Sequence, residues 1–182
     1  MSAKSSDVST GAQAVTATRP TQANVANGIC SIVTHLTIGA SVEKVWNGLL
    51  CYEDIAHKPP LLLRLLLPRP MPAGSQDRAM AGETTLRYED GHYTKRVTER
   101  EPPNRYEFEV IDQSLSADRG VTLLSGNFQL RTLATDQTDL AMTTRYTSRI
   151  APRWLAEPVE AMLCRRLHRH VLDAVRAKVL AQ

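Results

Sequence analysis

From residue 29 onward, apolar and polar residues follow two different periods along the chain. The segment Ile32–Ile38 alternates, with its apolar residues on one parity, which predicts a β-strand with one buried face. Ser41 is a suitable N-cap for the segment that follows. There the apolar residues recur every three or four positions, which predicts an amphipathic helix that ends between Cys51 and Ile55.

Residues 83–150 return to the two-residue period in several short segments. Asp90-Gly91 and Pro102-Pro103-Asn104 are turn signals between these segments, so the region predicts a meander of antiparallel strands. Along each strand the apolar residues keep one parity and the polar residues keep the other. We therefore expect a sheet with one face packed on a core and one face in water.

After Pro152, the stretch from Trp154 to Leu180 predicts one long amphipathic helix. The element order predicts an α+β fold, in which a curved antiparallel sheet wraps around the C-terminal helix and one or two short helices follow the first strand. The wedge between sheet and helix is a natural place for an apolar small-molecule site. The predicted apolar stripe of the long helix consists of Val159, Met162, Leu163, Leu167, His170, Val171, Ala174 and Val175.

Two segments stand outside this pattern. Residues 1–28 are rich in Ser, Thr, Ala and Gln, which predicts a disordered tail in front of one folded domain, residues 29–182. Leu61–Leu67 holds six leucines around Arg64, between prolines. Packing in the core is the simplest interpretation of this segment, and a lid over the cavity or a contact with membrane remains open because its apolar surface extends nearly all round.

Composition narrows the class of protein. The chain has 182 residues, of which 42% are hydrophobic, and no apolar run is long enough to span a bilayer. Cys30, Cys51 and Cys164 form no CxxC pair, so neither a disulfide framework nor a zinc site is indicated, and a reducing, cytoplasmic location is the simpler expectation. Phosphate-binding loops, nucleophile elbows and acidic metal clusters are also missing from the sequence, so we expect no cofactor and no metal.

The net charge of +3 resides mainly in the C-terminal segment, where residues 149–182 hold seven basic and three acidic residues. A solvated helix face is the simplest interpretation, although an anionic lipid, RNA or an acidic protein would also fit it. No aromatic residues are interleaved for base stacking, which argues against nucleic acid. The basic residues expected on the wet face of the helix are Arg165, Arg166, Arg169, Arg176 and Lys178.

The element order, with the residues from Ser41 to Trp46 opening the first helix, resembles the START-like superfamily of polyketide cyclases and coenzyme Q-binding proteins. The resemblance covers residues 29–180. Residues 52–64 and 169–172 are similar to a bacterial branch of this superfamily that has no assigned activity. The resemblance implies the helix-grip fold and a cavity for a hydrophobic ligand, and it transfers no catalytic motif.

Polar residues on the apolar parity of the strands are the candidates for chemistry. Lys95 shares its parity with Tyr93 and Val97, so strict alternation would turn its ammonium toward the cavity, to anchor an anionic ligand or to move protons. The sequence favours the plainer alternative, a bulge or a snorkelling stem that exposes Lys95. The residues predicted to line the ligand site are Tyr88, Tyr93, Lys95, Phe108, Phe128, Met142, Thr144, Tyr146, Leu163, Leu167 and His170.

Two histidines complete the set of catalytic candidates, Lys95, His57 and His170. His170 falls on the predicted stripe of the long helix, which is more typical of a core residue than of a proton-transfer group, while His168 falls on a different face. His57 follows Asp54 near the predicted cavity mouth. The two would form an acid/base pair, although an imidazole that interacts with a helix C-terminus is the plainer interpretation.

Three functions compete at this point. The leading hypothesis is a carrier or sensor that binds a hydrophobic small molecule such as a lipid, a quinone or a polyketide-like aromatic. The alternative is a cyclase or dehydratase that uses acid/base residues in the same cavity. A third is a module that contacts RNA, the ribosome or a membrane through the basic helix.

Overall fold

A computed structural model describes residues 28–50, 82–88, 91–114 and 120–181. Within these residues, six strands form one antiparallel sheet with the order β1-β6-β5-β4-β3-β2, so the first and last strands are neighbours. The strands are β1 (Ile29–Ile38), β2 (Glu83–Tyr88), β3 (Gly91–Glu101), β4 (Arg105–Ser114), β5 (Val121–Ala134) and β6 (Gln137–Ser148).

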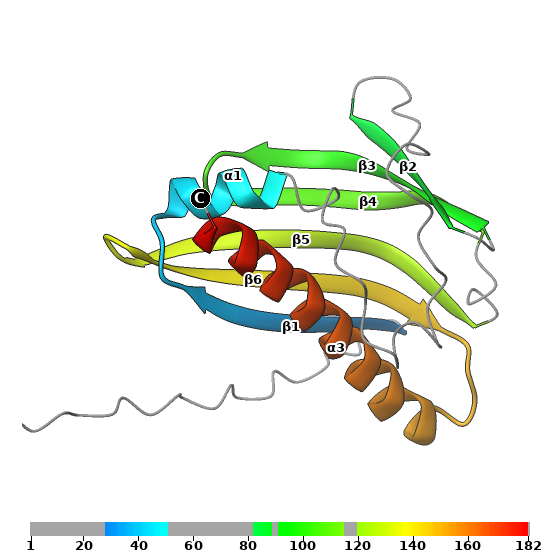
Figure 1. Ribbon diagram of the computed structural model, residues 1–182. Helices are drawn as coiled ribbons and strands as arrows, with labels where there is room; N and C mark the ends of the chain where they lie inside the picture. The colour runs from blue at the N-terminus through cyan, green and yellow to red at the C-terminus, as the bar shows by residue number, and fades with distance from the viewer. Residues whose placement is uncertain (1–27, 51–81, 89–90, 115–119, 182) are drawn as a thin grey trace, which may run out of the picture.

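Two helices cover one face of this sheet. The short helix α1 (Val42–Leu50) follows β1, and the long helix α3 (Arg153–Leu180) follows β6. In Figure 1 the sheet curves behind α3, which runs diagonally across β6 and β1, and the C-terminal end of α3 lies beside α1. This is the α+β arrangement that the sequence predicts, with a curved sheet and a long C-terminal helix.

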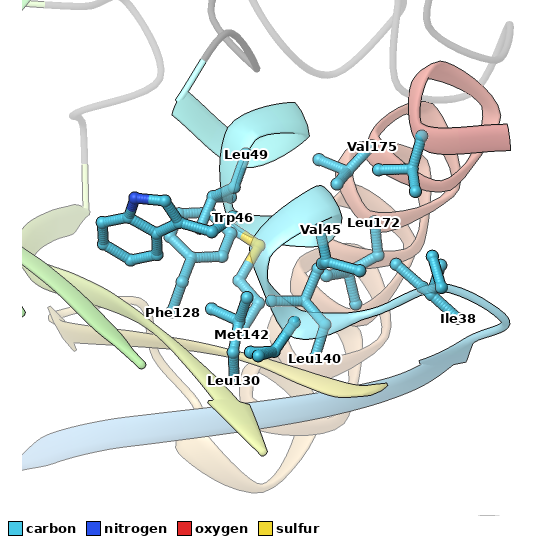
Figure 2. Packing of buried hydrophobic residues seen from close by; sticks show 13 residues of the cluster. Ile38, Val45, Trp46, Leu49, Phe128, Leu130, Leu140, Met142, Leu172 and Val175 are labelled. Atoms are coloured by element: carbon cyan, nitrogen blue, oxygen red, sulfur yellow. The ribbon is translucent and has the colours of Figure 1, made fainter. Parts of the chain in front are cut away.

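The main core lies where α1 and the C-terminal half of α3 meet the sheet. Figure 2 shows apolar side chains of α1 (Val45, Trp46, Leu49), α3 (Leu172, Val175) and the sheet (Ile38, Phe128, Leu130, Leu140, Met142) directed into one cluster. A second, smaller cluster contains Cys30, Ile32, Tyr146 and Ala161. Burial of these side chains is the principal force that holds the helices on the sheet.

The strand parities agree with the sequence, but the predicted phase of α3 is wrong. Its buried residues are Ala161, His168, Leu172, Ala174, Val175 and Val179. The predicted stripe shares only Ala174 and Val175 with this set, and Val159 and Met162 are exposed. The predicted stripe consists mainly of large aliphatic residues, whereas the observed stripe begins with Ala161 and includes His168 in place of His170.

Three of the sequence predictions concern residues outside the described ranges. They are the disordered tail over nearly all of its length, the end of the first helix beyond residue 50, and the Leu61–Leu67 segment with its three interpretations.

Candidate functional site

The inner face of the sheet, the face that α1 and α3 cover, carries one deeply buried cation. Lys95 in β3 is only 1% exposed, so the predicted bulge or snorkelling stem that would expose it is wrong. The register between β3 and β4 does shift next to Lys95. The side chain nevertheless keeps the inward parity.

Aromatic rings from β4 surround the Lys95 ammonium. Its Nζ lies 5.2 Å from the centroid of the Phe108 ring and 5.6 Å from that of the Tyr106 ring. It also makes a long contact of 3.5 Å with the Tyr106 hydroxyl. Ring faces attract cations electrostatically, and the attraction is stronger where water is excluded.

Glycine on β5 permits this arrangement. Gly126 is the register partner of Phe108, and a Cβ atom added at Gly126 would lie 2.5 Å from Phe108 Cζ. The absence of a side chain therefore lets the Phe108 ring lie against the β5 backbone. Phe108 and Tyr106 both pack on the main core, so the aromatic wall around Lys95 is continuous with it.

Burial changes the acidity of this lysine. Removal from water lowers the pKa of Lys95 from 10.5 to about 8, because the apolar surroundings disfavour the charged form. Lys95 therefore remains mostly protonated at neutral pH and loses its charge in mildly alkaline solution. An ammonium of this kind can attract an anionic or carbonyl oxygen, and its neutral form can accept a proton.

A second polar group lies beneath α3 and centres on His168. His168 is fully buried, with Nδ1 3.0 Å from the Thr34 hydroxyl in β1 and Nε2 2.8 Å from the Thr144 hydroxyl in β6. Its Nε2 also lies 3.4 Å from the Cys164 sulfur, one turn earlier in α3. The sequence placed His170 at this position and His168 elsewhere, and the structure reverses the two, since His170 is only partly buried.

The chemistry of the His168 group is that of a structural link. Burial, assisted by the charge of Arg165, lowers the pKa of His168 from 6.5 to about 4, so the imidazole is neutral near pH 7. Burial also raises the pKa of the Cys164 thiol to about 12, which leaves it a poor nucleophile. Both nitrogens of His168 are occupied by threonine hydroxyls, and these hydrogen bonds tie α3 to β1 and β6.

Tyr146 lies nearby on β6, opposite Cys30 in the register. It is 3% exposed, and among the described residues its hydroxyl has no hydrogen bond of good geometry, although the Cys30 thiol lies close enough to interact with it. Burial raises the pKa of this hydroxyl above its ordinary value, so it remains protonated. A buried hydroxyl without a well-formed hydrogen bond is uncommon in proteins and can still bond to a ligand.

The remaining predicted lining residues divide between buried and half-buried positions. Phe128 and Met142 are buried in the main core, whereas Tyr93, Phe108, Thr144, Leu163, Leu167 and His170 are half-buried. For Tyr88 the structure describes only the backbone, and His57 with Asp54 lies outside the described residues. The structure therefore brings Phe108 to Lys95, but it keeps Thr144 and Tyr146 on a strand three positions away in the sheet.

That separation matters for proton transfer. Lys95 in β3 and Tyr146 in β6 are separated by three strand spacings, roughly 14 Å at about 4.8 Å per spacing. Groups that exchange a proton must approach to within about 3 Å or share one water. Lys95 and Tyr146 therefore do not converge on one atom.

Sequence reasoning missed Tyr106, His168, Thr34 and Cys164. Tyr106 shares the parity of Phe108, which was the available signal, but its approach to Lys95 depends on the β3–β4 register. Within the described residues, no group of three or more His, Cys, Asp and Glu side chains could hold a metal ion.

Comparisons with known proteins agree with the architecture. No family model matches the sequence, and no curated protein matches it. Many solved structures match the fold. An aromatase/cyclase from Streptomyces matches with a TM-score of 0.56 and 17% identity over 83% of this chain and 93% of that one. The chain has the helix-grip fold.

Two other structures support the same conclusion. A truncated norcoclaurine synthase from Thalictrum flavum matches with a TM-score of 0.57 and 16% identity over 85% of this chain and 95% of that one. A START superfamily protein from Mycobacterium smegmatis matches with a TM-score of 0.55 and 13% identity over 83% of this chain and 97% of that one. At such low identity the likeness concerns the fold, and the site must be judged from its own residues.

Proposed function

We propose that this helix-grip protein is a carrier or sensor that binds a hydrophobic small molecule between its sheet and its C-terminal helix. The ligand would be a lipid, a quinone or a polyketide-like aromatic with an acidic or carbonyl oxygen. The observation that carries the proposal is the burial of the Lys95 ammonium against aromatic rings on the inner face of the sheet.

Burial of a charged side chain costs free energy. An ammonium removed from water destabilises the folded protein, and here the lowered pKa of Lys95 reflects that cost. An ammonium buried among aromatic rings is suited to bind a ligand that carries an acidic or carbonyl oxygen. Apolar walls with a few polar groups are typical of small-molecule sites.

Binding is better supported than catalysis. A cyclase or dehydratase needs at least two acid/base groups that converge on one point. His168 is neutral and its ring nitrogens are held by threonine hydroxyls, and Tyr146 lies three strands from Lys95. The Tyr106 hydroxyl does lie 3.5 Å from Lys95, but burial raises the pKa of Tyr106, which makes it a weaker acid. The aromatase/cyclase and the synthase among the structural matches keep the enzyme as the alternative. The cytoplasmic location remains a prediction from the cysteines.

The first test identifies the ligand. Native mass spectrometry of the full chain, purified from the cells that make it, should detect a bound molecule of a few hundred daltons, which extraction and fragmentation then identify. We expect an apolar molecule with an acidic or carbonyl oxygen. A purely hydrocarbon or strongly cationic ligand would contradict the role of Lys95.

The second test uses palmitate as a defined probe, with the corresponding fatty alcohol as the neutral comparison. Lys95→Met should weaken palmitate binding by tenfold or more and leave the alcohol unaffected, since only the carboxylate interacts with the ammonium. Lys44→Met is the matched control, because Lys44 is exposed on α1. Equal palmitate affinity in wild type and Lys95→Met would overturn the proposed anchor.

The pH dependence provides an independent check. Because the pKa of Lys95 is about 8, palmitate affinity should be constant between pH 6 and 7 and should fall as the pH rises above 8. The fatty alcohol should show no such fall. Titration calorimetry at several pH values measures both affinities. An equal fall in affinity for palmitate and for the fatty alcohol above pH 8 would contradict the proposal.

A further inference from the structure

The start of α3 carries an exposed apolar surface. Trp154 is 78% exposed, and the other members are also among the exposed large hydrophobic residues. The remaining exposed large hydrophobics in the described chain are Leu50 on α1, Ile111 on β4, Leu133 on β5 and Leu180 at the other end of α3. The members of this surface, called here the α3 apolar patch, are Ile150, Trp154, Leu155, Val159 and Met162.

The patch is exposed because of where α3 begins. Figure 1 shows the first turns of α3 (orange) extending past the edge strand β1. The buried residues of the helix start only at Ala161, and the two turns before it contact the sheet through the polar side chains of Arg153 and Glu160, which reach Cys30 and Ser148. Large apolar side chains gathered in such a place indicate contact with another apolar phase or partner.

The charges around the patch are almost entirely positive. Arg149, Arg166 and Arg169 are exposed beside it. Of the two acidic residues in residues 149–172, Glu160 is largely buried, with its carboxylate held by Arg153 at 2.9 Å and by Ser148 at 2.6 Å. The outer side of this part of α3 therefore presents apolar side chains and guanidinium groups, with Glu157 as the other acidic residue in this range and the exposed Asp173 one turn beyond Arg169.

We propose that the α3 apolar patch docks on the surface of a bilayer that contains anionic lipid. Trp154 suits the interfacial region, where an indole can be half buried and half hydrated. The neighbouring arginines suit lipid phosphates, each adding electrostatic attraction near an anionic surface. The helix would lie along the membrane plane, with its apolar side chains at the headgroup boundary.

The charge pattern distinguishes this partner from two others. In a symmetric dimer through the same patch, the arginines of the two copies would face each other and repel. A nucleic acid would accept the arginines but would leave most of the apolar side chains in water. No described helix is long and apolar enough to cross a membrane, so the proposed contact is peripheral.

The protein contains its own probe for the test. Of the two tryptophans, Trp46 is buried and Trp154 is exposed, so a change in polarity around the patch alters mainly the Trp154 emission. The full chain is mixed with vesicles of phosphatidylcholine alone or with 30% phosphatidylglycerol. We expect a blue shift of the emission and co-sedimentation only with the anionic vesicles, and a decrease of both at high salt.

Substitutions locate the contact. Trp154→Ser with Leu155→Ser, and separately Arg166→Glu with Arg169→Glu, should each lower the vesicle partition coefficient by more than tenfold. Leu133→Ser and Arg131→Glu are matched controls, because both residues are exposed at the β5–β6 end of the sheet. Circular dichroism checks that every variant is folded.

Several outcomes would overturn the proposal. One is the absence of any shift with anionic vesicles. Another is equal loss of binding in the control variants. Loss of binding in Leu62→Ser with Leu66→Ser, while the patch variants bind normally, would assign the membrane contact to the leucine-rich segment instead. A concentration-dependent shift without vesicles would assign the patch to a second copy of the chain.

Discussion

At the scale of single residues, two buried bases on the inner face perform different roles. Lys95 faces aromatic rings, whereas the His168 imidazole is held by hydroxyls from two strands. Both have a lowered pKa because burial disfavours the charged form. The surroundings differ, so the lysine is suited to a ligand and the histidine to the stability of the fold.

His168 makes the stability of the protein sensitive to acid. Its pKa is about 4 in the folded protein against 6.5 for an exposed histidine, so the unfolded chain binds more protons between these values. The contribution of the neutral imidazole is complete above pH 6.5 and is lost as the pH falls toward 4. We expect this loss to lower the free energy of unfolding by about 3 kcal/mol as the pH falls from 6.5 to 4.

Denaturant titrations from pH 7 to pH 4 measure this dependence. His168→Gln should reduce the fall in the free energy of unfolding between pH 6.5 and pH 4. It should also lower the free energy of unfolding at pH 7. His170→Gln is the matched control on the same helix and should retain the wild-type decline, because His168 is still present. An unchanged slope in His168→Gln would assign the acid sensitivity to other groups.

Tyr146 allows stability and binding to be separated. Since its hydroxyl has at most a weak interaction with the Cys30 thiol, Tyr146→Phe should change the free energy of unfolding by no more than about 1 kcal/mol. If the hydroxyl contacts the ligand, the same variant should bind the native ligand less tightly. Thermal unfolding and ligand titration test the two effects, and a large loss of stability would show that the hydroxyl has a partner.

At the scale of elements, the close approach of α1 to α3 depends on Gly48. A Cβ atom added there would lie 2.5 Å from Val179 Cγ2. On an isolated helix, Gly→Ala would be favourable by about 1 kcal/mol, so the contact and the helix propensity oppose each other. We expect the contact to prevail, because a β-branched side chain in a packed interface has little freedom to move.

A double-mutant cycle tests this expectation. Gly48→Ala should destabilise the protein by about 1–3 kcal/mol, and the combination with Val179→Ala should cost less than the sum of the two single changes. Asn47→Ala, at an exposed position of the same helix, is the control. Additive changes in the free energy of unfolding would mean that the two positions are independent.

The same elements show what a sequence can and cannot predict. Strand parity follows from local alternation, so the sequence predicts the inward direction of Lys95 as one of two alternatives. The phase of α3 was misjudged because Ala161, Cys164 and His168 are not strongly apolar, yet they face the sheet. The contact between Lys95 and Tyr106 depends on the pairing of two strands, and a single strand does not contain that information.

At the scale of the whole molecule, burial is unevenly distributed across the sheet. The largest fully buried side chains lie on β1, β5, β6, α1 and the C-terminal half of α3, except for Lys95 on β3. Hydrogen exchange should therefore be slowest in those elements and faster in β2 and in the first turns of α3. Addition of the ligand should slow exchange in β3 and β4 and in the parts of β6 and α3 that face the ligand, and unchanged exchange in β3 would argue against a site at Lys95.

The pairing of β1 with β6 has a consequence for synthesis and folding. Ile38 pairs with Thr138 and Ile29 with Thr147, so the strand that leaves the ribosome first must wait for the strand that leaves almost last. During that wait the inward edge of β1 is open, and such edges are prone to pair with other chains. Contacts so distant along the chain also slow folding, so we expect refolding in milliseconds to seconds, with yields that fall as the concentration of unfolded chain rises.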